Sequence, residues 1–375
     1  MKSVVLAGGL GSRLRPLTNH TPKSLLPFCN RPFLLHLLES LARGGVDEVL
    51  LSGGLDPAPV ARFAERGDLP FPASAFGEEE ALGTAGPIRV VADHLTETFV
   101  VANGDILSGV DIAELIAFHR ERGSICTIAL TPVDDPSAFG LVPIEEVGRV
   151  RAFLEKPSSP DEVPPDAGNL INAGVYVLEP EVIDFIHGNG ACSIEREVFP
   201  ALVDADLPVY GYSAPFYWSE IGTPGRYLDA HRDALRGLVE VSQAGDEIAP
   251  GVRAGAGVKV EAGAHLMGPC LIGENVVIGM GARIGPDVVL GNGVRVGAHA
   301  EIDESVVHGG CELGVGVRMS RAICGERVRL GRKSVVSGEA VVGPDVDAGD
   351  ENEFLAAIRV AGPNRLPNRA VRFSP

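Results

Sequence analysis

The stretch CLIGEN-VVIGMG-ARIGPD-VVLGNG-VRVGAH-AEIDES-VVHGGC, residues 270–311, repeats itself every six positions. In most of these hexads an aliphatic residue comes directly before a glycine, as in Ile272-Gly273. After a slip near Leu313–Arg321 the period resumes at Gly325. A hexapeptide repeat is a signature of a parallel β-helix, in which the aliphatic residue points inward and the glycine allows the corner. The second half of the chain is therefore predicted to form a triangular prism with three hexads in each coil.

The first half has a different pattern, in which short apolar runs alternate with helical ones. Strands are predicted at Val4–Ala7, Glu48–Ser52, Phe99–Ala102, Cys126–Thr131 and Gly174–Leu178, and helices at 32–44 and 112–123. This alternation favours an α/β domain whose mostly parallel sheet is covered on both faces. The predicted domains are residues 1–240, the prism at 241–350, and a tail at 351–375 with a short capping helix.

Charge and cysteine content exclude several classes of function. The 375 residues carry 32 Lys and Arg against 50 Asp and Glu, a net charge of −18, which argues against nucleic acid or an anionic membrane as the main partner. The six cysteines are scattered without a CxxC pair, which is typical of reduced thiols in a cytoplasmic protein. No apolar run reaches the length of a signal peptide or a membrane span. We therefore expect a cytoplasmic protein whose anion sites are built locally.

The segment VVLAGGLGSRLRPLTNHTPKSLLP, residues 4–27, predicts a phosphate site. A buried strand leads into a glycine-rich turn, which lets backbone N–H groups approach an anion, and Arg13, Arg15 and Lys23 follow. The turn is not a Walker A loop, because no Gly-Lys-Ser/Thr closes it. An ordinary strand–loop–helix turn with incidental surface cations is the alternative.

Five further clusters follow in the first half: EEEALGTAGPIR (78–89), VVANGDIL (100–107), FLEKP (153–157), NLINAGVYVLEP (169–180) and FYWSEIGTPGRY (216–227). Asp105 stands at the carboxyl end of a predicted strand, where a carboxylate can hold a hard cation that bridges phosphates. Taken singly, each cluster also fits a plain turn, a solvated strand end or a helix start.

In this order the clusters resemble the sugar-nucleotide pyrophosphorylases, over essentially the whole chain. The layout is most similar to the mannose-1-phosphate guanylyltransferase group, which joins a Rossmann-like catalytic domain to a left-handed β-helix. The resemblance implies that a nucleoside triphosphate and a sugar 1-phosphate give an NDP-sugar and pyrophosphate, with Mg²⁺ as cofactor. The Leu82–Gly86 loop favours GTP as the nucleotide, and the resemblance to this group alone implies mannose 1-phosphate as the sugar substrate.

The resemblance also implies roles for individual residues. Arg13, Lys23 and Asp105 are the implied catalytic residues, and Asp105 and Glu220 are the implied metal ligands. The implied nucleotide site consists of Leu6, Ala7, Gly8, Gly9, Gly11, Ser12, Arg13, Lys23, Glu80, Gly83, Thr84, Asn103 and Gly104. The implied sugar-phosphate site consists of Gly140, Glu155, Lys156, Asn172 and Gly174.

Three positions depart from the family pattern. Ser12 stands where Thr is usual and Phe139 where Tyr is common, and both changes are mild. Glu220 stands where Asp is the usual metal ligand, and its extra methylene matters because Mg²⁺ demands near-ideal octahedral geometry.

The same sequence motifs also fit other functions. A thymidylyl- or uridylyltransferase acting on glucose 1-phosphate fits the same motifs, and so does a non-catalytic regulatory paralogue that binds NDP-sugars. The prism is a candidate acetyltransferase because it carries His265, His299 and His308, although corner or surface positions suit them better. We expect the prism to stabilise the protein and to join copies into a homo-oligomer.

Overall fold

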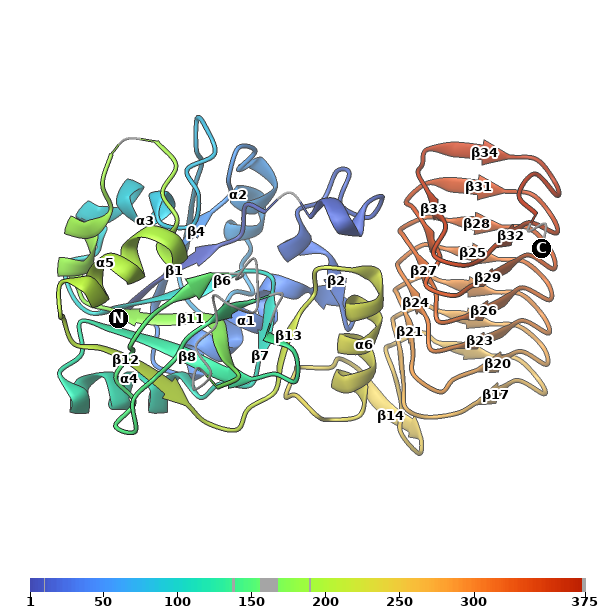
Figure 1. The fold of residues 1–375 in the computed structure, drawn as a ribbon. Helices are drawn as coiled ribbons and strands as arrows, with labels where there is room; N and C mark the ends of the chain where they lie inside the picture. The colour runs from blue at the N-terminus through green and yellow to red at the C-terminus, as the bar shows by residue number, and fades with distance from the viewer. Residues whose placement is uncertain (10, 137–138, 156–167, 189, 373–375) are drawn as a thin grey trace. The chain divides into compact units, whose positions relative to one another are not determined.

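The computed structural model describes residues 1–9, 11–136, 139–155, 168–188 and 190–372 (Figure 1). It divides into two compact units: residues 1–9 with 34–218, and residues 10–33 with 219–375. No helix among the described residues is long and apolar enough to cross a membrane.

The first unit is built on a sheet of nine strands among the described residues, with the order β10-β9-β11-β6-β1-β4-β5 and with β8 between β11 and β12. The strands are β1 (Lys2–Leu6), β4 (Glu48–Ser52), β5 (Ala73–Phe76), β6 (Phe99–Asn103), β8 (Cys126–Pro132), β9 (Gly140–Leu141), β10 (Leu154–Glu155), β11 (Leu170–Leu178) and β12 (Val209–Ser213). β1, β4, β5 and β6 are parallel, whereas β11 runs antiparallel to β6. The Rossmann-like, mostly parallel sheet is therefore confirmed.

Helices flank this sheet, and short strands complete the unit. The helices are α1 (Phe33–Arg43), α2 (Ala58–Ala64), α3 (Gly86–Val90), α4 (Ile112–Arg122) and α5 (Phe199–Asp204), and one short strand is β7 (Ile106–Ser108). The strand β13 (Trp218–Glu220) begins at the last residue of the first unit and continues in the second. α4 begins where the Asp111 side chain accepts a hydrogen bond from the Glu114 amide and ends at Gly123 in the left-handed conformation. These are the two signals that the sequence offers for this helix.

The pairing of the central strands brings two predicted loops together. Leu6, the last residue of β1, pairs with Ser52 of β4 on one side and Asn103 of β6 on the other. Ligands bind beyond the carboxyl ends of strands in sheets of this kind. The glycine turn after β1 and the Asn-Gly-Asp turn after β6 therefore lie at the same edge.

The second unit contains the prism, whose strands form three parallel sheets. One sheet is β15 (Val252–Ala254), β18 (Cys270–Ile272), β21 (Val288–Leu290), β24 (Val306–Val307), β27 (Ile323–Cys324), β30 (Val341–Val342) and β33 (Arg359–Val360), with β14 (Asp246–Ala249) antiparallel at its edge. The second is β16 (Lys259–Val260), β19 (Val277–Ile278), β22 (Arg295–Val296), β25 (Glu312–Leu313), β28 (Arg329–Leu330), β31 (Val346–Ala348) and β34 (Asn364–Leu366). The third is β17 (His265–Leu266), β20 (Arg283–Ile284), β23 (Glu301–Asp303), β26 (Arg318–Ser320), β29 (Val335–Ser337) and β32 (Glu353–Phe354).

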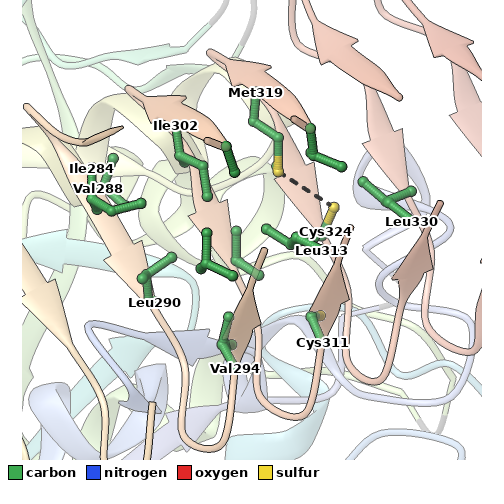
Figure 2. Packing of buried hydrophobic residues seen from close by; sticks show 14 of the residues in the cluster. Ile284, Val288, Leu290, Val294, Ile302, Cys311, Leu313, Met319, Cys324 and Leu330 are labelled. Atoms are coloured by element: carbon green, nitrogen blue, oxygen red, sulfur yellow. Dashed lines mark hydrogen bonds between the residues drawn. The ribbon is translucent and has the colours of Figure 1, made fainter. Parts of the chain in front are cut away.

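The inside of the prism is filled by the aliphatic residue of each repeat. Figure 2 shows Ile284, Leu290 and Met319 among these side chains, and all three are buried. The glycine that follows is needed because coils stack closely: a Cβ on Gly291 would lie 2.5 Å from the backbone nitrogen of Gly309. Both features confirm the β-helix predicted from the repeat.

The register of the repeat differs from the prediction. The inward positions advance by five residues from Ile302 to Val307 and again from Met319 to Cys324, so there are two short repeats and not one slip near 313–321. Paired residues in successive coils are accordingly 18 apart at Cys270 and Val288 but 17 apart at Ile302 and Met319. Because Val307 is the inward residue, His308 takes the position that glycine holds elsewhere.

The tail also differs from the prediction. Between residues 351 and 372 the structure has no helix, and β32, β33 and β34 continue the three sheets. The inward residues Phe354, Val360 and Leu366 keep the six-residue spacing, so the pattern of the prism persists although its glycines do not. The predicted capping helix was wrong because the period was judged from glycines.

Candidate active site

The turn after β1 is shaped by backbone contacts. The Ala7 amide donates to Ser52 O at 3.0 Å and the Gly104 amide donates to Leu6 O at 2.9 Å. Gly8 packs so closely against Gly54 that a Cβ would overlap its backbone, whereas a Cβ on Gly9 would lie more than 4 Å from every described residue except its chain neighbours. Gly8 is thus required by the fold, and the open space at Gly9 suits approach by a ligand.

The Leu-Gly-Thr-Ala-Gly loop is held by a segment more than a hundred residues later in the sequence. Gly83 has φ +75°, and a Cβ there would lie 2.5 Å from Cys192 O. The Thr84 hydroxyl donates to Glu195 Oε2 at 2.6 Å and accepts from the Ile194 amide at 2.9 Å. These contacts fix the predicted base-binding loop.

Glu80, one of the residues predicted to lie near the base, has an exposed side chain. Its neighbour Glu78 supports the loop instead: Oε1 accepts from the Ser52 hydroxyl at 2.8 Å and Oε2 accepts from the Leu82 amide at 3.0 Å. A role for Glu80 stays a prediction.

The predicted sugar-site residues Asn172 and Gly174 lie within β11, against the end of β6. The Asn172 side chain accepts from the Gly174 amide at 2.8 Å and donates to the Tyr176 hydroxyl at 2.7 Å, within an irregularity of the β11–β8 pairing. Gly174 has φ +71°, and a Cβ there would lie 2.7 Å from Asn103 Nδ2. The Asn103 Oδ1 atom is buried and has no hydrogen-bond partner among the described residues. Asn103, Asn172 and Gly174 are therefore brought together.

The remaining sugar-site residues lie on short strands near β11. Gly140 of β9 is buried and pairs with Glu155 of β10, and Leu141 pairs with Ile171 of β11. The Trp218 indole donates to Ala173 O at 3.1 Å. Lys156 lies outside the described residues.

In the second unit, three cations surround one carboxylate. Arg13 Nη2 donates to Glu220 Oε1 at 2.7 Å, and Arg226 Nη1 donates to Glu220 Oε2 at 2.9 Å. Lys23 Nζ lies 3.9 Å from Glu220 Oε1 and is 10% exposed. Arg13 follows Gly11, whose φ of 54° starts a 3₁₀ turn at Ser12–Leu14, and Lys23 starts another at Lys23–Leu25. The two predicted phosphate cations and the predicted metal ligand thus form one ionic cluster.

The segment that carries these cations is anchored on α6 (Pro224–Leu235) and on the prism, all within the second unit. The buried Tyr227 hydroxyl donates to Pro27 O and lies 3.0 Å from His308 Nε2. Burial lowers the pKa of His308 to about 4, so the imidazole is neutral and donates from Nε2 to the hydroxyl. In addition, Asn30 Nδ2 donates to Leu290 O of β21 at 2.9 Å.

Sequence reasoning missed several of these contributors. Arg226 lies six residues after Glu220, inside a motif already singled out, so its charge was a usable signal. Glu195 bonds to Thr84, 111 residues away, and Tyr227 bonds to Pro27, 200 residues away. No local sequence pattern predicts such pairs. Of the prism histidines, His265 and His299 are not buried, whereas His308 is.

Comparison with known proteins shows which family the chain belongs to. The nucleotidyl transferase family model matches residues 2–237, and the model of the GMPPB C-terminal domain matches residues 266–372. A mannose-1-phosphate guanylyltransferase of Mycobacterium tuberculosis (strain ATCC 25618 / H37Rv) is 42% identical over 289 residues, covering 75% of this chain and 77% of that protein. A protein of Oryza sativa subsp. japonica, named probable mannose-1-phosphate guanylyltransferase 3, is 36% identical over 381 residues, covering 100% of this chain and 98% of that protein.

A solved structure agrees with these relatives. HddC from Yersinia pseudotuberculosis, complexed with GMP-PN, is 26% identical with a TM-score of 0.52, and the match covers 61% of this chain and 97% of that chain. The family match spans the α/β sheet, the glycine turn and the cation-bearing segment described above. This chain belongs to the nucleotidyl transferase family.

Proposed function

We propose that the protein transfers GMP from GTP to mannose 1-phosphate, which gives GDP-mannose and pyrophosphate. The observation that carries the proposal is similarity along the whole chain, 36% over 100% of its length, to a relative named for this activity. The complex of HddC with GMP-PN supports the choice of a guanine base.

The reaction needs no protein nucleophile. A phosphate oxygen of the sugar 1-phosphate attacks the α-phosphorus of GTP, and pyrophosphate leaves. The protein has to position two polyanions and offset their repulsion. Arg13 and Lys23 are the residues we assign to the triphosphate and the departing pyrophosphate, and their convergence on one carboxylate supports an anion site there.

The other predicted contacts follow the loops that the fold has built. We assign the base to Gly83 and Thr84, the nucleoside to the Leu6–Gly9 backbone, and the sugar to Asn172 and Gly174. In the part of the chain that the structure describes, the buried Oδ1 of Asn103 has no hydrogen-bond partner, which supports a polar ligand contact beside Gly174.

We further propose that Asp105 and Glu220 hold Mg²⁺. Among the described residues no group of three or more His, Cys, Asp or Glu side chains is arranged to hold a metal. Mg²⁺ sites that use one or two carboxylates together with substrate phosphates do not need such a group, and carboxylate oxygens are the donors this ion prefers. When bound, the ion would neutralise charge on the phosphates.

A matrix of nucleoside triphosphates against sugar 1-phosphates, read by pyrophosphate release with and without Mg²⁺, tests the proposal. We expect the highest kcat/KM for GTP with mannose 1-phosphate and no release without a divalent cation. Asp93→Asn, a carboxylate outside the proposed site, is the matched control for Asp105→Asn. Preference for dTTP or UTP would overturn the guanylyl assignment, and no release with any pair would favour a non-catalytic NDP-sugar-binding protein.

For the prism we propose a structural role that includes joining copies of the chain. Its first coils carry the exposed apolar side chains Val260, Met267 and Met280, each more than 40% exposed, which are our candidates for the contact. Light scattering should report a homo-oligomer that Met280→Lys weakens, and a monomeric wild type would refute this role.

A further inference from the structure

Glu220 forms its ion pairs with the side chains that the proposed function assigns to phosphate. Its two carboxylate oxygens accept from two different guanidinium groups, Oε1 from Arg13 and Oε2 from Arg226. The carboxylate is 20% exposed, whereas Arg13 is 60% and Arg226 39% exposed. One anionic group is thus held between two accessible guanidinium forks.

Two features show that this pairing is built into the chain. Gly222 leaves room for it, because a Cβ there would lie 2.5 Å from Glu220 Oε1 and 2.8 Å from Arg13 Nη2. The length of the glutamate is also needed: an aspartate would withdraw the carboxylate by roughly 1.5 Å, one carbon–carbon bond, and break contacts of 2.7 and 2.9 Å. The departure from the family's aspartate therefore fits the two arginines.

Guanidinium groups bind carboxylate and phosphate oxygens with the same planar geometry. A phosphate can therefore take the place of the Glu220 carboxylate between Arg13 and Arg226, with little change in either arginine. Lys23, 3.9 Å from Oε1, adds a third positive charge beside the carboxylate.

We propose that Arg226 binds substrate phosphate together with Arg13, and that Glu220 is an internal anion that occupies this pair until phosphate replaces it. The proposal rests on the proposed function, because it uses the triphosphate or pyrophosphate as the incoming anion. Anion binding releases the Glu220 carboxylate from Arg13. By linkage, a divalent cation that binds the released carboxylate favours anion binding, and the anion favours the cation to the same degree.

The test is binding of inorganic pyrophosphate to the full chain by calorimetry, first in EDTA and then with Mg²⁺. Glu220→Gln keeps the shape of the side chain and removes the competing charge, so metal-free pyrophosphate should bind about tenfold more tightly than to wild type. Unchanged or weaker binding would show that Glu220 does not compete. The matched control is Glu351→Gln, which breaks a 2.6 Å ion pair with Arg369 elsewhere in the same unit. It should leave the affinity for pyrophosphate unchanged.

Gly222→Ala separates competition from a general change in charge. The added methyl would lie 2.5 Å from Glu220 Oε1 and 2.8 Å from Arg13 Nη2, so it should push the two groups apart while the net charge stays the same. Tighter metal-free binding in this variant supports the internal anion, and binding equal to wild type contradicts it.

The role of Arg226 is tested in the Glu220→Gln background. If Arg226 contacts phosphate, adding Arg226→Met should weaken pyrophosphate binding about tenfold. If Arg226 only anchors Glu220, adding Arg226→Met in this background will leave pyrophosphate affinity unchanged. That result would exclude Arg226 as a phosphate-binding residue. Because these measurements use neither base nor sugar, they can fail while nucleotidyl transfer succeeds, and they can succeed while the substrate assignment fails.

Discussion

Replacing Tyr227 by Phe tests whether the prism fixes the phosphate-binding segment. The side chain is fully buried, and its hydroxyl donates to Pro27 O and accepts from His308 Nε2. Removal of the hydroxyl takes this partner from the buried His308 donor and from the partly buried Pro27 acceptor. Such a loss costs about 1–3 kcal/mol at a buried group and less at a partly buried one. We expect the free energy of unfolding to fall by about 2–4 kcal/mol in urea titrations.

The same variant should affect substrate binding more than the chemical step. Pro27 ends the segment that carries Arg13 and Lys23, so loosening it should raise the KM for GTP several-fold with a smaller change in kcat. Tyr212→Phe is the matched control, because that hydroxyl donates to Glu114 on the first unit's surface at 2.9 Å and its loss should cost less than about 1 kcal/mol. A Tyr227→Phe protein as stable as this control, with an unaltered KM, would refute the reasoning.

Three further outcomes are expected. Gly8→Ala should abolish GTP binding in calorimetry, because its methyl would overlap the Gly54 backbone and displace the turn that we assign to the nucleoside. A GTP affinity within about twofold of wild type would contradict the close packing of Gly8 against Gly54. Asp105→Asn should lower kcat by about a hundredfold or more while leaving the melting temperature within a few degrees, and near-normal turnover would remove Asp105 from the metal site. The pKa of His308 is 6.5 in the unfolded chain and about 4 in the folded protein, so between these values only the unfolded chain binds the proton. The free energy of unfolding of wild type should therefore fall by up to roughly 3 kcal/mol as the pH falls from 6.5 towards about 4. His308→Gln should lack this loss in urea titrations at about pH 7.5 and about pH 4.5, and parallel losses would show that His308 does not titrate as described.

The sequence predicts those parts of the fold that repeat or alternate. The six-residue period identifies the prism because most of its repeats combine an inward aliphatic residue with a corner glycine. α4 was equally accessible, since its capping residue and its terminal Gly123 are local signals. The capping helix was wrong because Phe354, Val360 and Leu366 keep the period without glycine.

The site was predictable in its loops and less so in its contacts. Gly83 and Gly174 were identified through the family resemblance, and both have a positive φ that favours glycine. The pairing of Glu220 with Arg13 joins residues 207 positions apart and depends on the space that Gly222 leaves. Such a contact follows from the folded backbone, and a single sequence carries no pattern for it.

The membership of residues 10–33 in the second unit has a consequence for recombining members of this family. A chimera that takes residues 1–237 from one parent and the prism from another would separate Tyr227 and Asn30 from the prism residues His308 and Leu290 that they contact. The natural module for exchange is therefore discontinuous, with residues 10–33 travelling together with 219–375. Crossovers placed at both ends of that short segment should yield working hybrids more often than a single crossover at the end of the family match.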